Sequence, residues 1–251
     1  MSLPRVVAAE TLDGLAADDL AAMGSRRDLR RVHMVMGTRA IVAGALRRLT
    51  AGHRRAAPLR VLELGAGDGT LMLGVARVLK PHWPVVELEL LDRQKLVSPA
   101  TLQAYAALGW QARDRVSDVF DWVASGSEPA PGQTLARWDV IVVNLFLHHF
   151  EGAPLTALLG AVAGRSHRFL ACEPRRSRLA LAGSHLLGLM GANAVTREDA
   201  VLSVHAGFAQ GEMAALWPAG GFGWTLKDYP AGLFSHCFSA SRSPLDAEAA
   251  P

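Results

Sequence analysis

Hydrophobic and polar positions change their periodicity partway along the chain. In the first part, apolar residues recur at helical spacing, and no stretch alternates as a strand would. Ser25, with Asp28 three residues on, is typical of a helix N-cap and predicts a boundary after Gly24. The helices expected here cover 18–23, 25–36 and 40–49. Because this block is too small for a core of its own, we expect residues 1–57 to form a helical cap on the rest of the chain.

From Leu59 onward, short apolar strands alternate with amphipathic helices. Such alternation favours an α/β fold with a doubly wound, mostly parallel sheet, and a closing hairpin adds an antiparallel strand. The strands are expected at 59–64, 85–91, 111–116, 138–143, 167–172, 223–229 and 234–241. The intervening helices are expected at 71–79, 102–108, 155–163, 178–190, 196–206 and 210–216. Residues 125–134 read as a loop, and 243–251 as a frayed tail.

The first strand runs directly into a glycine-rich turn and then a helix. Gly65, Ala66 and Gly67 follow the strand, so the backbone there can approach a ligand with little side chain in the way. The helix N-terminus would point free N–H groups at the same ligand. Glu63, inside an otherwise apolar strand, is costly to bury unless it meets a donor or a cation. The Gly-x-Gly-x-Gly spacing also differs from the Gly-x-Gly-x-x-Gly of dinucleotide binders.

This stretch resembles the first motif of class I S-adenosylmethionine (SAM)-dependent methyltransferases. The resemblance implies SAM as the cofactor, S-adenosyl-L-homocysteine as the product, and the cationic amino-acid end of SAM near Glu63, Gly65, Ala66 and Gly67. It also implies a Rossmann-like methyltransferase fold of seven strands, with the last inserted antiparallel between the fifth and the sixth. The methyltransferase domain would then span 58–242, with a helical lid inserted at about 175–208.

Acidic residues follow the second and third strands, where ligands of open α/β sheets bind. Asp92, followed by Arg93, lies about 20 residues beyond the glycines, at the place for an acid that accepts ribose hydroxyls. Asp118 and Val119 look like the adenine site of the family, in which the acid takes the exocyclic amine and an apolar neighbour covers the ring. Asp118 as a plain helix N-cap is an equal alternative.

After the fourth strand come Asn144 and Leu145, where the family forms the floor beneath the transferred methyl. His148 and His149 follow, and each is a candidate general base or a helix cap. A base is needed only if the acceptor arrives protonated, as a phenol does. His33, on a helix of the cap, is a third catalytic candidate. We expect no metal, because adjacent histidines on a helix point in different directions and no acidic cluster accompanies them.

Composition narrows the class of partner. Half of the 251 residues are hydrophobic and the formal net charge is only +3, without a basic tract, which argues against a nucleic-acid partner. Cys172 and Cys237, the two cysteines, are expected to be buried free thiols. The N-terminal sequence lacks the pattern of a signal peptide, and no apolar run is long enough for a membrane span. We therefore expect a cytoplasmic protein without a membrane span.

Together these features favour a SAM-dependent methyltransferase that acts by in-line displacement on a small, largely apolar molecule, such as a phenol, a quinone precursor or a polyketide. A nucleic-acid or protein methyltransferase is the alternative, weakened by Asn144-Leu145-Phe146-Leu147 where amino-methylating enzymes carry Asn/Asp-Pro-Pro-aromatic. A nicotinamide-dependent oxidoreductase is disfavoured by the glycine spacing, and a non-catalytic SAM-binding protein stays open. The acceptor, the atom methylated and the oligomeric state are not determined by the sequence.

Overall fold

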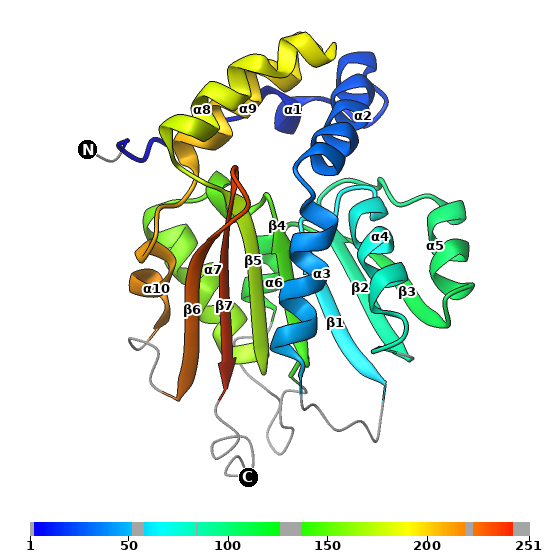
Figure 1. Ribbon diagram of the computed structural model, residues 1–251. Helices are drawn as coiled ribbons and strands as arrows, with labels where there is room; N and C mark the ends of the chain where they lie inside the picture. The colour runs from blue at the N-terminus through cyan, green and yellow to red at the C-terminus, as the bar shows by residue number, and fades with distance from the viewer. Residues whose placement is uncertain (1–2, 52–57, 84, 126–136, 219–222, 243–251) are drawn as a thin grey trace.

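The computed structural model describes residues 3–51, 58–83, 85–125, 137–218 and 223–242 (Figure 1). Almost all of the predicted loop at 125–134 and all of the predicted tail at 243–251 lie outside these residues. A single sheet runs through the molecule, and helices cover both of its faces.

The sheet has seven strands in the order β3-β2-β1-β4-β5-β7-β6. The first five pair in parallel, whereas β7 lies antiparallel between β5 and β6. This confirms the predicted topology, including the inserted last strand. The strands are β1 (Leu59–Leu64), β2 (Val86–Asp92), β3 (Trp110–Val116), β4 (Val140–Asn144), β5 (Arg168–Pro174), β6 (Trp224–Ala231) and β7 (Ser235–Arg242).

Alternate residues of the central strands serve two separate cores. In β4, Val140 and Val142 belong to one cluster of buried residues, and Ile141 and Val143 belong to the other. Both faces are therefore apolar, which explains why these strands read as continuous hydrophobic runs. Helices α3 (Thr38–Leu49), α4 (Thr70–Leu79) and α5 (Pro99–Ala106) contribute to the first cluster or pack against it. Helices α6 (Val119–Ala124), α7 (Gly152–Arg165) and α10 (Glu212–Leu216) contribute to the second.

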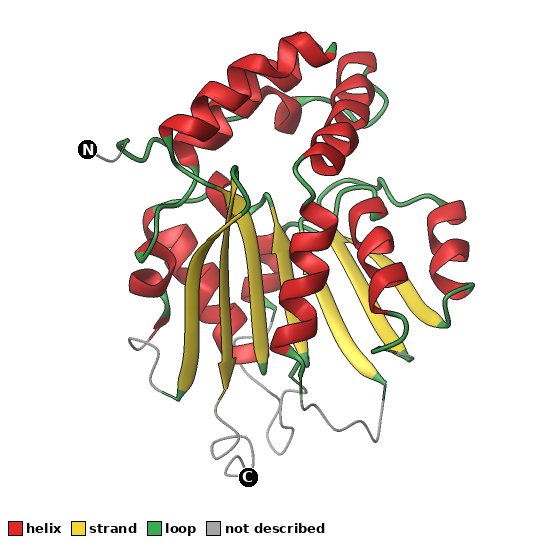
Figure 2. Ribbon diagram, viewed as in Figure 1, coloured by secondary structure: helices red, strands yellow, loops and turns green. Residues whose placement is uncertain are grey.

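Helix α3 lies on the sheet and not above it, although the sequence placed it in the cap at 1–57. Val42 and Leu46 are buried in the first core cluster, and the helix packs against α4. The apolar stripe of α3 is compatible with packing on the sheet or in the cap, because a stripe does not specify the surface that covers it. The helices above the strand ends are α1 (Thr11–Gly14), α2 (Leu20–Val35), α8 (Arg178–His185), the 3₁₀ helix η2 (Leu186–Met190) and α9 (Ala194–Ala206) (Figure 2).

The predicted helix boundary at Gly24 and Ser25 is wrong, because α2 runs through both residues. Asp19 is the actual N-cap and accepts hydrogen bonds from the next turn. A Cβ on Gly24 would lie 2.9 Å from Nδ2 of Asn193, so this glycine allows α2 and the start of α9 to approach closely. Ser25 is buried and accepts a hydrogen bond of 2.9 Å from the hydroxyl of Thr196.

Cys172 and Cys237 are buried free thiols, as predicted, and face each other across β5 and β7. Within the described part of the chain, no helix is both long and apolar enough to cross a membrane.

The placement of α3 predicts a large cost for truncating its buried face. Leu46 is 0% exposed, so Leu46→Ala should lower the free energy of unfolding by roughly 2–5 kcal/mol through lost burial and a cavity. Leu20 on α2 is 84% exposed, and Leu20→Ala is the matched control, with an expected effect within about 0.5 kcal/mol. Urea denaturation measures both, and equal effects would contradict the assignment of α3 to the core.

Candidate active site

The turn between β1 and α4 is shaped by three glycines with positive φ, Gly65, Gly67 and Gly69, where a side chain would be strained. Gly65 has φ 69°, and a Cβ there would approach the ring of Phe146 to 2.3 Å. Gly67 has φ 56°, with open space where a Cβ would stand. The N–H of Gly67 donates to Oδ2 of Asp92 at 2.8 Å. The end of β2 therefore holds the turn in place.

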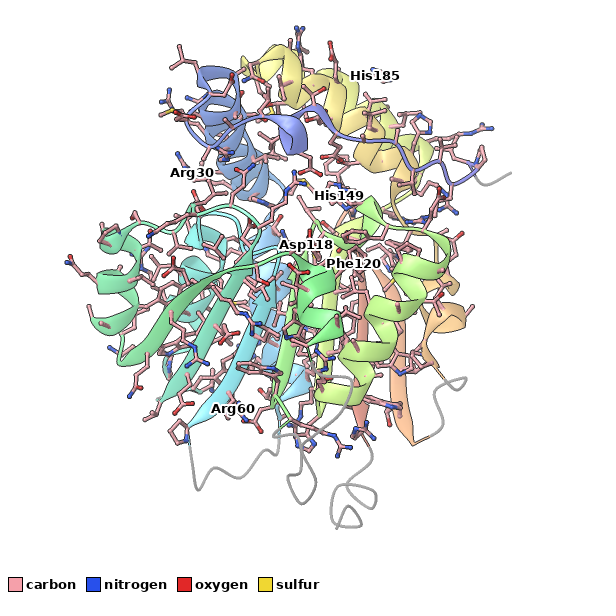
Figure 3. All side chains as sticks on the ribbon, turned by 180° about the vertical axis from the view of Figure 1, so that it is seen from behind. Arg30, Arg60, Asp118, Phe120, His149 and His185 are labelled. Carbon is pink, nitrogen blue, oxygen red and sulfur yellow. The ribbon has the colours of Figure 1, made fainter. Side chains whose placement is uncertain are left out.

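A cavity of about 640 Å³ lies over the carboxyl ends of the strands beside this turn. Figure 3 shows His149 above Asp118 and Phe120 at this edge of the sheet. Among the residues predicted for the site, only His148 is absent from the cavity lining. The structure brings together Glu63, Gly65, Ala66, Gly67, Asp92, Arg93, Asp118, Val119, Asn144, Leu145, His33 and His149.

Two buried acceptors in the lining have no hydrogen-bond partner among the described residues: Oε2 of Glu63 and Oδ1 of Asn144. Burial, followed by the charges of Asp92 and Asp68, raises the pKa of Glu63 to about 8. Unpaired buried acceptors are costly, and a cationic donor in the cavity would satisfy them. The floor of the cavity is thus suited to a positively charged group.

The acids after β2 and β3 already accept backbone hydrogen bonds. Asp92 receives the N–H of Gln94 at 2.9 Å in addition to that of Gly67. Asp118 accepts from the N–H of Phe120 at 2.7 Å, so it is the N-cap of α6, one of the two interpretations left open by the sequence. Asp118 also lines the cavity, and its contact with adenine stays a prediction.

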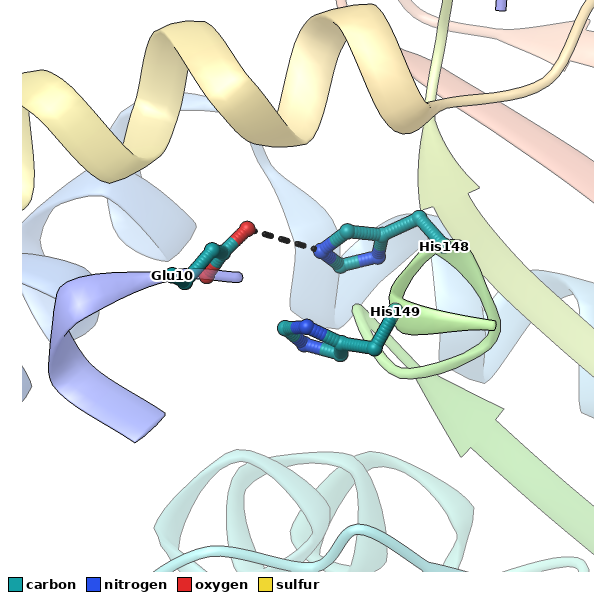
Figure 4. A group of neighbouring side chains, drawn as sticks. All are labelled: Glu10, His148 and His149. Carbon is teal, nitrogen blue, oxygen red and sulfur yellow. Dashed lines mark hydrogen bonds and ion pairs between the residues drawn. The ribbon is translucent and has the colours of Figure 1, made fainter. Parts of the chain in front are cut away.

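His148 is 2% exposed and lies between two carboxylates. Its Nδ1 is 2.8 Å from Oε2 of Glu173. Its Nε2 is 3.2 Å from Oε1 of Glu10 (Figure 4). Burial alone would lower the pKa of His148, but the hydrogen bonds to Glu10 and Glu173 outweigh it and raise the pKa to about 9. Glu173 also accepts the N–H groups of Phe146 and Leu147. His148 is therefore an imidazolium that joins three segments of the chain.

His149 has the opposite electrostatic character. Its ring centroid lies 4.2 Å from that of His148, and its Nδ1 is 3.3 Å from Oδ2 of Asp13. Burial, followed by the charge of His148, lowers the pKa of His149. His149 is thus a neutral imidazole in the cavity over the strand ends, with the carboxylate of Asp13 beside its ring. Such a group is suited to accept a proton near neutral pH.

We expected no metal because adjacent histidines on a helix point in different directions, and this reason is wrong. His148 and His149 occupy a 3₁₀ turn, η1 (Leu147–His149), and both rings extend toward Glu10 (Figure 4). One ligand atom from each of these three residues lies within 4.8 Å of the others. In the structure, the hydrogen bonds of His148 to Glu10 and Glu173 occupy both of its ring nitrogens. The absence of a metal stays a prediction.

His33 lines the cavity from α2, with its Nδ1 3.3 Å from the hydroxyl of Thr38. Burial lowers the pKa of His33 to about 4, so its ring is neutral. Without a carboxylate at hydrogen-bond distance among the described residues, it lacks the orienting partner that His149 has in Asp13.

The sequence did not reveal the N-terminal strap, which we define as residues 3–15. Oε1 of Glu10 accepts a hydrogen bond from the hydroxyl of Ser203 on α9. The carboxylate of Asp199 accepts the N–H groups of Thr11 and Leu12 at 2.8 and 2.9 Å. These bonds hold the strap across the strand ends, where Glu10 and Asp13 line the cavity described above. No local spacing links these residues, because their partners lie far along the chain.

A second cavity, of about 280 Å³, lies between α2, α8, η2 and α9. It shares Glu10, Leu12, Leu29 and Leu145 with the cavity over the strand ends. Leu145 has φ 51°, a conformation that is strained for a leucine. A strained residue at the junction of two cavities indicates a position held for function.

A scan against protein-family models finds no match, and a search of curated proteins finds none either. Solved structures do match. The plantazolicin methyltransferase BpumL, in complex with SAH, superposes with a TM-score of 0.64 at 13% identity, covering 90% of this chain and 92% of that one. An O-methyltransferase family protein from Burkholderia thailandensis gives 0.56 at 16% identity, over 90% of this chain and 61% of that one.

Magnesium protoporphyrin IX methyltransferase (ChlM) from Synechocystis PCC 6803, with bound SAH, gives a TM-score of 0.51 at 14% identity, over 92% of this chain and 91% of that one. The chain therefore has the Rossmann-like fold of these methyltransferases, as its sequence predicted.

The buried imidazolium predicts a pH dependence of stability. Because the pKa of His148 is about 9 in the folded protein and about 6.5 in the unfolded chain, its stabilisation is complete below pH 6.5 and is lost as pH rises through 9. His148→Gln should remove up to about 3 kcal/mol of stability at low pH and should flatten this dependence.

Urea denaturation at several pH values between about 6 and 10 would measure the effect. His185→Gln, at an exposed histidine of α8, is the control and should keep the wild-type profile. A wild-type profile that does not fall across this range would contradict the charged state of His148.

Proposed function

We propose that this protein is a SAM-dependent methyltransferase whose acceptor is a small, largely apolar molecule. The observation that carries the proposal is the pair of unpaired buried acceptors, on Glu63 and Asn144, beside the glycine turn. SAM carries an ammonium and a sulfonium, which suit such a floor. The pyrophosphate of a dinucleotide is anionic and has no donor for these acceptors.

The lining residues fit the separate parts of SAM. Glu63 and Asn144 would hold the amino-acid end, with the backbone at Gly65 and Gly67 alongside, and Asp92 would accept the ribose hydroxyls. Asp118 and Val119 would meet the adenine. When bound, the cofactor supplies a methyl group on a sulfonium, which is already activated for in-line displacement. Matches to SAH-bound methyltransferases of the same fold support this assignment.

The chain's own contribution would be alignment, exclusion of water and proton acceptance. His149 would take the proton of an acceptor hydroxyl, while Asp13 orients its ring. His148 is already protonated and buried, so it would act as a positioning residue rather than as the base. A neutral base poised in the cavity favours an enzyme over a non-catalytic SAM-binding protein.

The second cavity supports the small, apolar acceptor. Its lining is largely leucine, methionine, valine and alanine, and it joins the cofactor cavity where the methyl would be transferred. No arginine or lysine of the described residues lines it, so it offers nothing to the phosphates of a nucleic acid.

The proposal predicts that SAM binding is coupled to the ionisation of Glu63. At neutral pH the free protein holds a proton on this carboxyl, and a bound cation would displace it. Affinity for SAM should therefore rise as pH increases from about 6 to 8. Calorimetry in buffers of different ionisation enthalpy should detect proton release, and NAD should bind poorly.

Glu63→Gln should abolish this proton release and weaken SAM binding by about 1.5–3 kcal/mol, the range for hydrogen bonds to charged groups. Glu89→Gln is the matched control, because Glu89 is also buried in its strand but pairs with Arg113 and Arg115 away from the cavity. Tighter binding of NAD than of SAM would overturn the proposed function.

The role of His149 predicts a pH-dependent loss of turnover. With a phenolic acceptor at neutral pH, His149→Ala should lower kcat by roughly 10²–10⁴-fold, the usual contribution of a general base. The deficit should shrink toward pH 10, where a phenol ionises by itself. His33→Ala, in the same cavity, should have a much smaller effect on kcat. A deficit that stays constant up to pH 10 would exclude His149 as the base.

A further inference from the structure

The second cavity has room for a ligand, but few of its hydrogen-bonding groups are free to contact one. The polar side chains of its lining already hydrogen-bond within the protein: Glu10 with Ser203, Thr196 with Ser25, Ser184 with the carbonyl of Leu181, and Asp199 with the strap backbone. A polar ligand would lose its hydrogen bonds to water on entering and gain few in return. The occupant that fits this cavity is therefore hydrocarbon.

The opening of the cavity is marked by exposed apolar side chains. Val35 on α2 is 66% exposed, and Leu186 and Met190 on η2 are 57% and 42% exposed, yet all three also line the cavity. Met34 and Leu189, beside them in sequence, are exposed as well. Large apolar residues that are exposed and also line a cavity indicate that the cavity opens to solvent beside them and that an apolar molecule could enter there.

The inner end of the cavity has a different chemistry. There it meets the cofactor cavity at Glu10, Leu12, Leu29 and the strained Leu145, and His149 lines the far side of this junction. A molecule lying along the whole path would place its polar end at the neutral base and its other end between the exposed residues of α2 and η2.

We infer that the acceptor is an amphiphile, with a nucleophilic hydroxyl on a small ring at the junction and a linear hydrocarbon tail in the second cavity. This inference rests on the proposed function and specifies its substrate class. The reaction joins the methyl carbon to the hydroxyl oxygen, breaks the bond from that carbon to the sulfonium sulfur, and leaves the hydroxyl proton on His149. The tail contributes to binding by burial alone.

The test is a chain-length series. The affinities of 4-methylphenol, 4-butylphenol, 4-hexylphenol and 4-octylphenol for the protein with SAH present would be measured by calorimetry. Methyl transfer from SAM to the same phenols would be followed in parallel. Each methylene buried in the cavity should lower Kd by roughly three- to fourfold, levelling off when the tail reaches the opening. The same trend should appear in kcat/KM.

A cavity-filling variant locates the effect. Ala200 lines the cavity from α9, and Ala200→Phe should abolish the dependence on chain length while leaving the affinities for SAH and 4-methylphenol unchanged. Ala194→Phe, at an exposed position of the same helix that does not line the cavity, should keep the wild-type dependence. The wild-type series decides the inference even if Ala200→Phe fails to fold.

The outcomes distinguish a failure of the tail site from a failure of the cofactor site. Equal affinity for all the phenols in a protein that binds SAH would overturn the hydrocarbon tail and leave the methyltransferase proposal standing. A clear chain-length dependence in a protein that does not bind SAH would support the apolar site and overturn the proposed cofactor. A dependence that persists undiminished in a folded Ala200→Phe variant would place the tail elsewhere and overturn the assignment to this cavity.

Discussion

The imidazolium of His148, held between Glu10 and Glu173, is the interaction on which the site depends. Glu173 fixes the turn after β4 through the N–H groups of Phe146 and Leu147, and Glu10 fixes the strap. Replacing such a buried ionic cluster with apolar residues often costs little stability, so its value lies in position rather than in net energy. Removing the central charge, in contrast, would leave the carboxylates of Glu10 and Glu173 without this counter-charge. One electrostatic interaction thus holds the strap and the turn together, and Glu10, which takes part in it, lines both cavities.

The same charge separates the roles of two adjacent histidines. Charged partners on either side keep His148 protonated, and the resulting cation helps to keep His149 neutral. Two groups of one chemical type thereby become a fixed cation and a free base, because their environments push their pKa values apart. In the same cavity, Glu63 lacks a partner for one of its oxygens among the described residues, and a cation would supply it. The site therefore combines unpaired hydrogen-bond acceptors on the floor of one cavity with a base close to the apolar cavity.

The parts predicted correctly from sequence are those written in local patterns. The strand, the glycine turn and helix α4 are adjacent in the chain, and the closing hairpin together with the family resemblance predicted the antiparallel β7. The errors arose where the role of a residue depends on a partner that is distant in the sequence. Gly24 was interpreted as a helix end, but in the fold it allows Asn193 to lie close to α2. The apolar face of α3 was visible in the sequence, but the surface that it packs against was not. Glu10 carried no signal, since Ser203 and His148 meet it only in the fold.

The two ligands of the proposed reaction would reach the site by different routes, and the cost of opening each route differs. The strap over the cofactor cavity is held by Asp199, Ser203 and the buried charge at His148, so lifting it would expose or strand ionic groups. The opening between α2 and η2 is lined by exposed apolar side chains, which cannot hydrogen-bond to one another. An acceptor tail could therefore enter and leave by side-chain rearrangement alone. The acceptor could then exchange without breaking the hydrogen bonds that hold the strap.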